Sequence, residues 1–143
     1  MSHVFVKHFR VGMQPVRYSL FVLSKGENAG KPLREPCPNC FSLVARSRSD
    51  REKIYWIFYG LWQVGYFKMF LVGSVIPFLR IVDLKTIVIR FCDQSVLNND
   101  ITLRALKNII KLERLHSRLN HQMKIVCQVR RLVTVRLIKG LEN

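Results

Sequence analysis

The sequence contains few acidic residues. Only 9 of its 143 residues are aspartate or glutamate, against 24 lysines and arginines, which gives a formal net charge of +15. An average soluble enzyme is near neutral, and a positive field of this size attracts polyanions. Nucleic acid is the commonest such partner, an anionic membrane surface is the second, and a charge that binds no ligand is the third alternative. The composition therefore predicts a class of partner.

The sequence also lacks the segments that export and membrane insertion require. Met1 to Lys7 contains no apolar core followed by small residues, so no secretory signal is expected. The most apolar stretch, Ile54 to Val82, is interrupted by Lys68 and Arg80. No run reaches the roughly 20 apolar residues that span a bilayer. We therefore expect a cytoplasmic protein without a membrane partner.

Cysteine is scarce, with four in the chain, and without a secretory signal these are expected to be reduced thiols. Cys37-Pro38-Asn39-Cys40 has the spacing of half a zinc ribbon. The second half is missing, because only Cys92 and Cys127 remain. The sequence therefore predicts no metal site and two half-buried thiols that flank a turn. A zinc site and a redox pair are the alternatives.

Sequence motifs for catalysis are absent as well. None of the four histidines accompanies a carboxylate pair or a nucleophile motif, and neither HExxH nor GxSxG occurs. Lys25 to Pro32 contains two glycines and two lysines, but Gly30-Lys31 runs into Pro32 instead of a Ser or Thr that opens a helix. This order does not match a phosphate-binding loop, so we expect an exposed loop, although a flexible basic loop of this kind can still touch a nucleic-acid backbone. We expect no enzyme, no cofactor and no small-molecule substrate.

Most of the aromatic residues and the longest stretches without charge occur between Ser49 and Ile89. Ser49-x-x-Glu52 fits a capping box, which predicts that a helix starts there. Apolar residues follow at helical spacing, and aromatic neighbours widen the apolar face beyond that of a surface helix. The apolar residues are Ile54, Ile57, Phe58 and Leu61, and the aromatic neighbours are Tyr55, Tyr59 and Trp62. The pattern predicts a largely buried helix.

Strands are indicated by short β-branched and aromatic segments. Val16–Leu23 is the strongest and is expected to be central, whereas Val4–Val11 alternates only weakly. Further strands are predicted at Phe41–Arg46, Ser74–Leu79 and Thr86–Ile89, with Asp83-Leu84-Lys85 as a turn or a single helical turn. The fold class is therefore α+β, a small, mostly antiparallel β-sheet with packed helices in residues 1–92, followed by one long C-terminal helix.

Residues 93–143 are predicted to form that long basic helix, which starts at Asp93 or Asp100 and runs to about Ile138. No Gly or Pro interrupts the segment before Gly140. Apolar residues recur in it every three or four positions, and we call this set the apolar seam. The seam consists of Leu115, Leu119, Met123, Val126, Val129, Val133 and Leu137. A small domain cannot cover a seam of this length, so a partner helix is expected, from a second copy or from another protein.

Two groups of basic residues are the candidate nucleic-acid contacts. The first group, on the approach to the capped helix, is Arg46, Arg48 and Arg51. The second group forms a stripe on the long helix and consists of Arg104, Lys107, Lys111, Arg114 and Arg118. Cations four residues apart repel one another unless something neutralises them, and arginine is suited to phosphate. We predict that both groups bind DNA phosphates; a solvated surface is the alternative.

The chain contains the segment Gly73-Ser74-Val75-Ile76-Pro77-Phe78-Leu79, followed by Asp83-Leu84 and Ile87-Val88-Ile89. This order of motifs resembles the closing half of a target recognition domain. Such domains belong to type I restriction-modification specificity subunits, in which a strand of this type, an Asp-Leu turn and an Ile-x-Ile strand lead into a long helix. A complete subunit has two recognition domains and two helices, whereas this chain has one of each. The chain is also similar to a family of small proteins of unknown function from bacterial mobile elements.

The resemblance implies sequence recognition in DNA, but that family reads bases from variable loops, so no base-contacting residue carries over. Together with the charge, it predicts a non-catalytic DNA-binding module whose long helix makes a homodimer or joins a helical partner protein. The first alternative is an interaction protein whose basic surface docks an acidic protein. The second is a zinc-ribbon-like RNA binder that uses Cys37 and Cys40.

Overall fold

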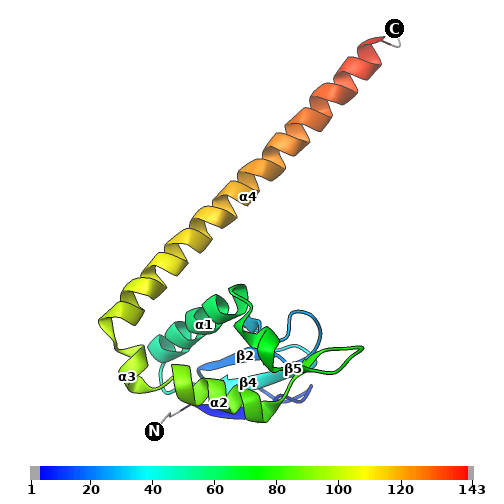
Figure 1. Cartoon of the computed structure of the whole chain (residues 1–143). Helices are drawn as coiled ribbons and strands as arrows, with labels where there is room; N and C mark the ends of the chain where they lie inside the picture. Colours follow the sequence, from blue (N-terminus) through cyan, green and yellow to red (C-terminus); the bar gives the residue numbers. More distant parts are fainter. Residues whose placement is uncertain (1–3, 142–143) are drawn as a thin grey trace. The chain divides into compact units, whose positions relative to one another are not determined.

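A computed structural model describes residues 4–141 of the chain; Met1–His3 and residues 142–143 lie outside the described residues. Two compact units divide the chain after Leu106. The first unit holds two small sheets with helices, and the second is the remainder of the last helix (Figure 1). The elements are β1 (Phe5–His8), β2 (Ser19–Leu23), β3 (Pro32–Leu33), β4 (Cys40–Val44), α1 (Arg48–Gln63), η1 (Tyr66–Phe70), β5 (Leu71–Val72), β6 (Phe78–Leu79), α2 (Ile81–Phe91), α3 (Gln94–Leu97) and α4 (Asp100–Leu141).

The larger sheet has four antiparallel strands in the order β1-β4-β2-β3. β2 pairs with β4 on one side and with β3 on the other, so the predicted central position of the Val16–Leu23 strand is confirmed. The regular strand begins only at Ser19, because Tyr18 has a left-handed backbone with φ of 61°. The α+β fold class is confirmed as well.

One face of this sheet forms the core together with α1 and α2. Alternate residues of β2 and β4 point toward the helices, and these are Leu20, Val22, Phe41 and Leu43. The helices contribute Ile54 and Phe58 from α1 and Leu84, Ile87 and Val88 from α2. Each fully buried large apolar side chain stabilises the fold by about 1.5 to 3 kcal/mol. Phe21 faces the other side of the sheet, where Phe9 packs edge-on at 5.3 Å between ring centroids.

The start of α1 differs from the predicted capping box. The N-cap is Ser47 rather than Ser49, and its Oγ accepts a hydrogen bond from the amide of Asp50 at 3.1 Å. Glu52 does not reach back to the cap. Its two carboxylate oxygens accept from Nη1 and Nη2 of Arg34, at 2.7 and 2.9 Å. The ion pair thus ties α1 to the segment after β3, and Ser47-x-x-Asp50 is the capping sequence that the helix uses.

The predicted strand Thr86–Ile89 is wrong, because these residues lie in α2. The predicted turn at Asp83-Leu84-Lys85 lies near the start of the same helix. Leu84, Ile87 and Val88 are three and four residues apart, so in a helix all three enter the core. Burial therefore outweighs the β-propensity of the β-branched side chains.

The predicted strand Ser74–Leu79 is also shorter than expected. Only Phe78–Leu79 forms β6, which pairs with β5. Gly73 has φ of +100°, and Val75 is 89% exposed. The segment before Pro77 is therefore the tip of a hairpin.

The long C-terminal helix is confirmed as α4, with 42 residues, and it continues through Gly140. It begins at the later of the two predicted starts, because α3 occupies Gln94–Leu97. Residue 92, the boundary predicted from the sequence, is the C-cap of α2. No helix in residues 4–141 is long and apolar enough to cross a membrane.

The glycine loop between β2 and β3 packs against the core. Gly30 is buried, has φ of +94°, and a Cβ built on it would lie 2.3 Å from Cγ of Phe67, itself a core residue. Gly26, four residues earlier, has φ of +89° but nothing within 4 Å of such a Cβ. Gly30 therefore permits both a left-handed turn and the close approach of η1 to this loop.

We expect Gly30→Ala to lower the free energy of unfolding by about 2 to 5 kcal/mol, because it adds a steric clash with Phe67 to the backbone strain. The matched control is Gly26→Ala, which carries only the backbone strain and should cost about 1 to 2 kcal/mol. Urea denaturation followed by circular dichroism measures both. Equal losses for the two variants would contradict this packing.

The Arg34–Glu52 pair makes stability depend on pH. The hydrogen bonds that Glu52 accepts from Arg34 lower the pKa of Glu52 from 4.5 to about 2. A carboxyl whose pKa is lower in the folded state contributes stability above its unfolded pKa and loses it as pH falls through the folded pKa. The difference in unfolding free energy between wild type and Glu52→Gln should be about 1 kcal/mol at neutral pH, since the pair is partly solvated.

That difference should shrink as pH falls from 4.5 toward 2, and urea titrations across this range measure it. Glu35→Gln is the control, because Glu35 is exposed next to Arg34 in the segment after β3 and has no ion-pair partner within residues 4–141. A difference that is independent of pH would show that Glu52 acts by packing alone.

Candidate nucleic-acid interface

The first basic group lies at the N-terminus of α1. Arg46 and Arg48 flank the Ser47 cap, both are exposed, and neither side chain has a hydrogen-bond or ion-pair partner among the described residues. Arg51 differs, because it is half-buried and its Nη2 donates to Oε1 of Glu52 at 2.9 Å. Two of the three arginines are therefore free to contact phosphate without breaking a bond.

The second basic group is divided between the two units. Arg104 belongs to the first unit, and the other four cations belong to the second. One groove on α4 is lined by three cations of the stripe, Lys111, Arg114 and Arg118. Its other lining residues are Asn108, Leu112 and Leu115, of which Leu115 belongs to the apolar seam. The cationic stripe therefore runs beside the apolar seam on the helix surface.

Charge is strongly segregated in the described part of the second unit, residues 107–141. Its only carboxylate is Glu113, whose Oε2 lies 3.9 Å from Nδ1 of His116. Its nine cations are Lys107, Lys111, Arg114, Arg118, Lys124, Arg130, Arg131, Arg136 and Lys139. Self-repulsion on this scale destabilises a helix unless an anion neutralises it.

The apolar seam of α4 is exposed. Leu119 is 50% exposed, Val126 61% and Val133 60%, and no residue from 114 to 141 is buried. Soluble proteins rarely expose a contiguous apolar surface of this length unless it contacts a partner. The exposed seam is therefore a candidate surface for a partner helix.

Sequence reasoning placed the aromatic residues of α1 on a buried face, but four rings are only half-buried. We call these rings, Tyr55, Trp56, Tyr59 and Trp62, the aromatic face. Ring centroids lie 6.4 Å apart for Tyr55 and Tyr59, nearly parallel at 15°, and 6.0 Å apart for Tyr59 and Trp62. Their spacing of three and four residues was visible in the sequence, but it does not say which side of the helix meets the sheet.

Two cations from outside α1 lie over this aromatic face. Cζ of Arg34 is 4.3 Å from the centroid of Tyr55, and Nζ of Lys31 is 5.0 Å from that of Trp62. Each such contact stabilises the ring position by about 0.5 to 1 kcal/mol at an exposed site. The sequence did not reveal these two cations, because they flank β3 and come to lie over the rings only through the pairing of β3 with β2.

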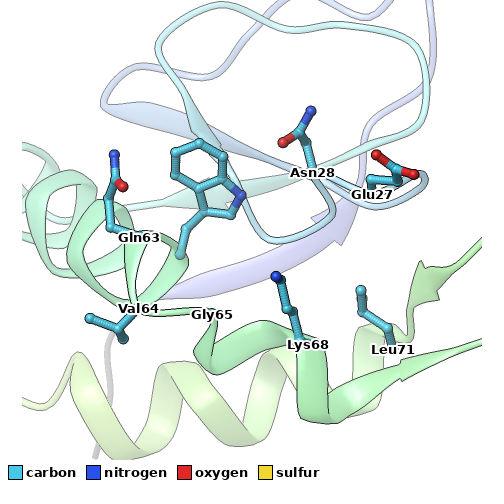
Figure 2. Close-up of a pocket in the computed structure, with 8 residues that line it drawn as sticks. Glu27, Asn28, Gln63, Val64, Gly65, Lys68 and Leu71 are labelled. Atoms are coloured by element: carbon cyan, nitrogen blue, oxygen red, sulfur yellow. The ribbon is translucent and has the colours of Figure 1, made fainter.

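A cavity of about 810 Å³ lies at the C-terminal end of the aromatic face. Figure 2 shows polar groups from two directions, with Glu27 and Asn28 on the glycine loop and Lys68 rising from η1. Gln63 and the ring of Trp62 also line it. The cavity therefore combines an aromatic ring with hydrogen-bond donors and a cation.

All four cysteines are free thiols in the described chain: Cys127 is exposed on α4, Cys37 is half-buried, and Cys40 and Cys92 are buried. Burial raises the pKa of the Cys40 thiol, and burial raises that of Cys92 to about 12. Protonated thiols are poor metal ligands. Within residues 4–141 no cluster of three or more His, Cys, Asp or Glu side chains could hold a metal ion.

Comparison with known proteins gives one match. No curated protein and no solved structure matches this chain. One family model, a family of unknown function (DUF6943), matches residues 6–136, which include nearly all of both units. The similarity to a family of unknown function is thus confirmed, and no role comes with it. The chain belongs to the DUF6943 family of proteins of unknown function.

Proposed function

We propose that this protein is a non-catalytic DNA-binding module that holds phosphates with basic surfaces and assembles through α4. The observation that carries the proposal is the charge segregation on α4, with nine cations against one carboxylate in residues 107–141. Repulsion in such an arrangement destabilises the helix, and neutralisation of the cations from outside the helix removes it. Duplex DNA carries one negative charge per roughly 1.7 Å of its axis and supplies this neutralisation.

The exposed arginines at the start of α1 support the same reading. Arg46 and Arg48 have no partner among the described residues, so phosphate contacts cost no internal ion pair. The arginine fork matches phosphate geometry better than an ammonium group does. Contacts of this kind hold the duplex in position without reading its sequence.

The resemblance to target recognition domains favours DNA over other polyanions. It now rests on the segment Gly73–Leu79 and on the long helix that follows α2 and α3, because Ile87–Ile89 is helical here rather than a strand. Recognition domains of that kind read bases from loops, and the hairpin tip with exposed Val75 is such a loop. The specificity-subunit relationship is part of this proposal.

Assembly through α4 follows from the exposed apolar seam. Each large aliphatic side chain that a partner helix covers contributes about 1.5 to 3 kcal/mol. A second copy of α4 brings a matching seam, whose β-branched and leucine residues suit helix pairing. An acidic protein helix is the second candidate partner, since the cationic stripe borders the seam at Lys111, Arg114 and Arg118.

The first test measures how DNA binding depends on salt. If roughly six cations contact phosphate, the affinity for a fluorescent duplex should fall on the order of a thousandfold between 50 and 200 mM salt. Arg46→Ser with Arg48→Ser should reduce the log–log slope by about two, for all sequences alike. Lys111→Ser with Arg114→Ser and Arg118→Ser should reduce it by about three.

Lys85→Ser is the matched control, because Lys85 is exposed on α2 outside both basic groups, and it should leave the slope unchanged. Fluorescence anisotropy at several salt concentrations gives the slopes. A duplex that shows no salt-dependent binding, or slopes that the substitutions leave unchanged, would reject DNA in favour of the acidic protein partner.

The second test concerns assembly. Leu119→Asp with Val126→Asp should shift the sedimentation mass toward the monomer, because both side chains lie in the seam and charge cannot be buried there unpaired. Ser117→Asp with Gln128→Asp adds the same charge on the opposite side of the helix and should leave the mass unchanged. A wild-type protein that sediments as a monomer would contradict self-association.

A further inference from the structure

We infer that the aromatic face of α1 and the cavity beside Trp62 form a stacking platform for single-stranded nucleic acid. The inference rests on the proposed nucleic-acid function and specifies one surface of it. It differs from duplex binding, because a duplex hides the faces of its bases, whereas an unpaired strand can lay them on aromatic rings.

The first support is the alignment of cations and rings on α1. Arg48, Arg51, Tyr55, Tyr59 and Trp62 follow one another at intervals of three or four residues, so they form one stripe along the helix. The arginines stand at the helix N-terminus, where the helix dipole also favours anions. A strand along this stripe has phosphates at the arginine end and bases over Tyr59 and over the faces of Tyr55 and Trp62 that Arg34 and Lys31 leave uncovered.

The second support is that the rings are held in place before any ligand binds. Nε2 of Gln63 donates to the hydroxyl of Tyr59 at 2.8 Å, and Lys31 lies over Trp62. Arg34 lies over Tyr55 while its guanidinium donates to Glu52. Rings fixed in this way lose little rotamer freedom on binding, and the nearby cations attract the phosphates that link the bases.

The third support is the cavity at the end of the stripe. Its volume of about 810 Å³ exceeds what a single base needs, and it is lined by Trp62, Gln63, Asn28 and Lys68. Amide groups suit the polar edge of a base, and an ammonium group suits its phosphate. Three carboxylates lie on or near this surface: Asp50 and Glu52 at the arginine end, where Glu52 is paired with Arg34 and Arg51, and Glu27 in the lining of the cavity.

Intrinsic fluorescence tests this inference directly, because Trp56 and Trp62 are the two tryptophans of the chain and both belong to the aromatic face. Titration of the full-length protein with oligo(dT) of about 15 nucleotides should quench this fluorescence. An abasic strand of equal length offers the same phosphates without bases and should bind on the order of tenfold more weakly. A uridine RNA strand that behaves like oligo(dT) supports the platform equally.

Tyr59→Leu and Trp62→Leu should each weaken oligo(dT) binding on the order of tenfold and leave duplex binding unchanged. Tyr59→Phe and Trp62→Phe keep a ring and should restore most of the affinity. Retained binding by the leucine variants, or equal binding of the abasic strand, overturns stacking. Salt-dependent duplex binding without quenching by oligo(dT) overturns this inference and leaves the proposed function intact, whereas no binding of either nucleic acid overturns both.

Discussion

The packing of α1 against one face of the four-stranded sheet decides what the rest of the first unit presents to solvent. Ile54 and Phe58 enter the core with Leu20 and Leu43, so the helix cannot rotate without exposing them. This orientation turns Tyr55, Trp56 and Tyr59 of the aromatic face toward solvent, while Trp62 also packs against the core. The Arg34–Glu52 pair and the Ser47 cap then hold the end of the helix in position. The candidate stacking surface is thus a consequence of the core.

The second unit is stabilised differently from the first, because it is a single helix and has no hydrophobic core. An isolated helix in water depends on propensity and on contacts between neighbouring side chains, and repulsion among nine cations opposes both. A partner helix on the seam and phosphates on the cationic stripe would each remove one cause of instability. Assembly and polyanion binding would then stabilise α4 together, since either ligand favours the helical state.

The extent to which the sequence predicts the fold varies with the element. The long helix was predictable because no Gly or Pro interrupts a helical pattern before Gly140. The strand predicted at Thr86–Ile89 was wrong, because burial of Leu84, Ile87 and Val88 in a helix outweighs the local β-propensity. Capping was assigned to Ser49 because Ser49-x-x-Glu52 fits a capping box, and only the hydrogen bond from the amide of Asp50 identifies Ser47 as the cap.

The sequence by itself determined the class of fold, the charge that attracts polyanions, the two basic groups and the apolar seam, since composition and spacing are properties of the chain. Only the tertiary structure decided that Arg51 is tied to Glu52 while Arg46 and Arg48 have no ion-pair partner among residues 4–141. It also decided that the aromatic face is half-exposed, with the two cations that flank β3, Lys31 and Arg34, over the rings. The contacts of Lys31 and Arg34 with the rings join residues distant in sequence, and side-chain pairing and burial depend on which face of a helix meets the sheet.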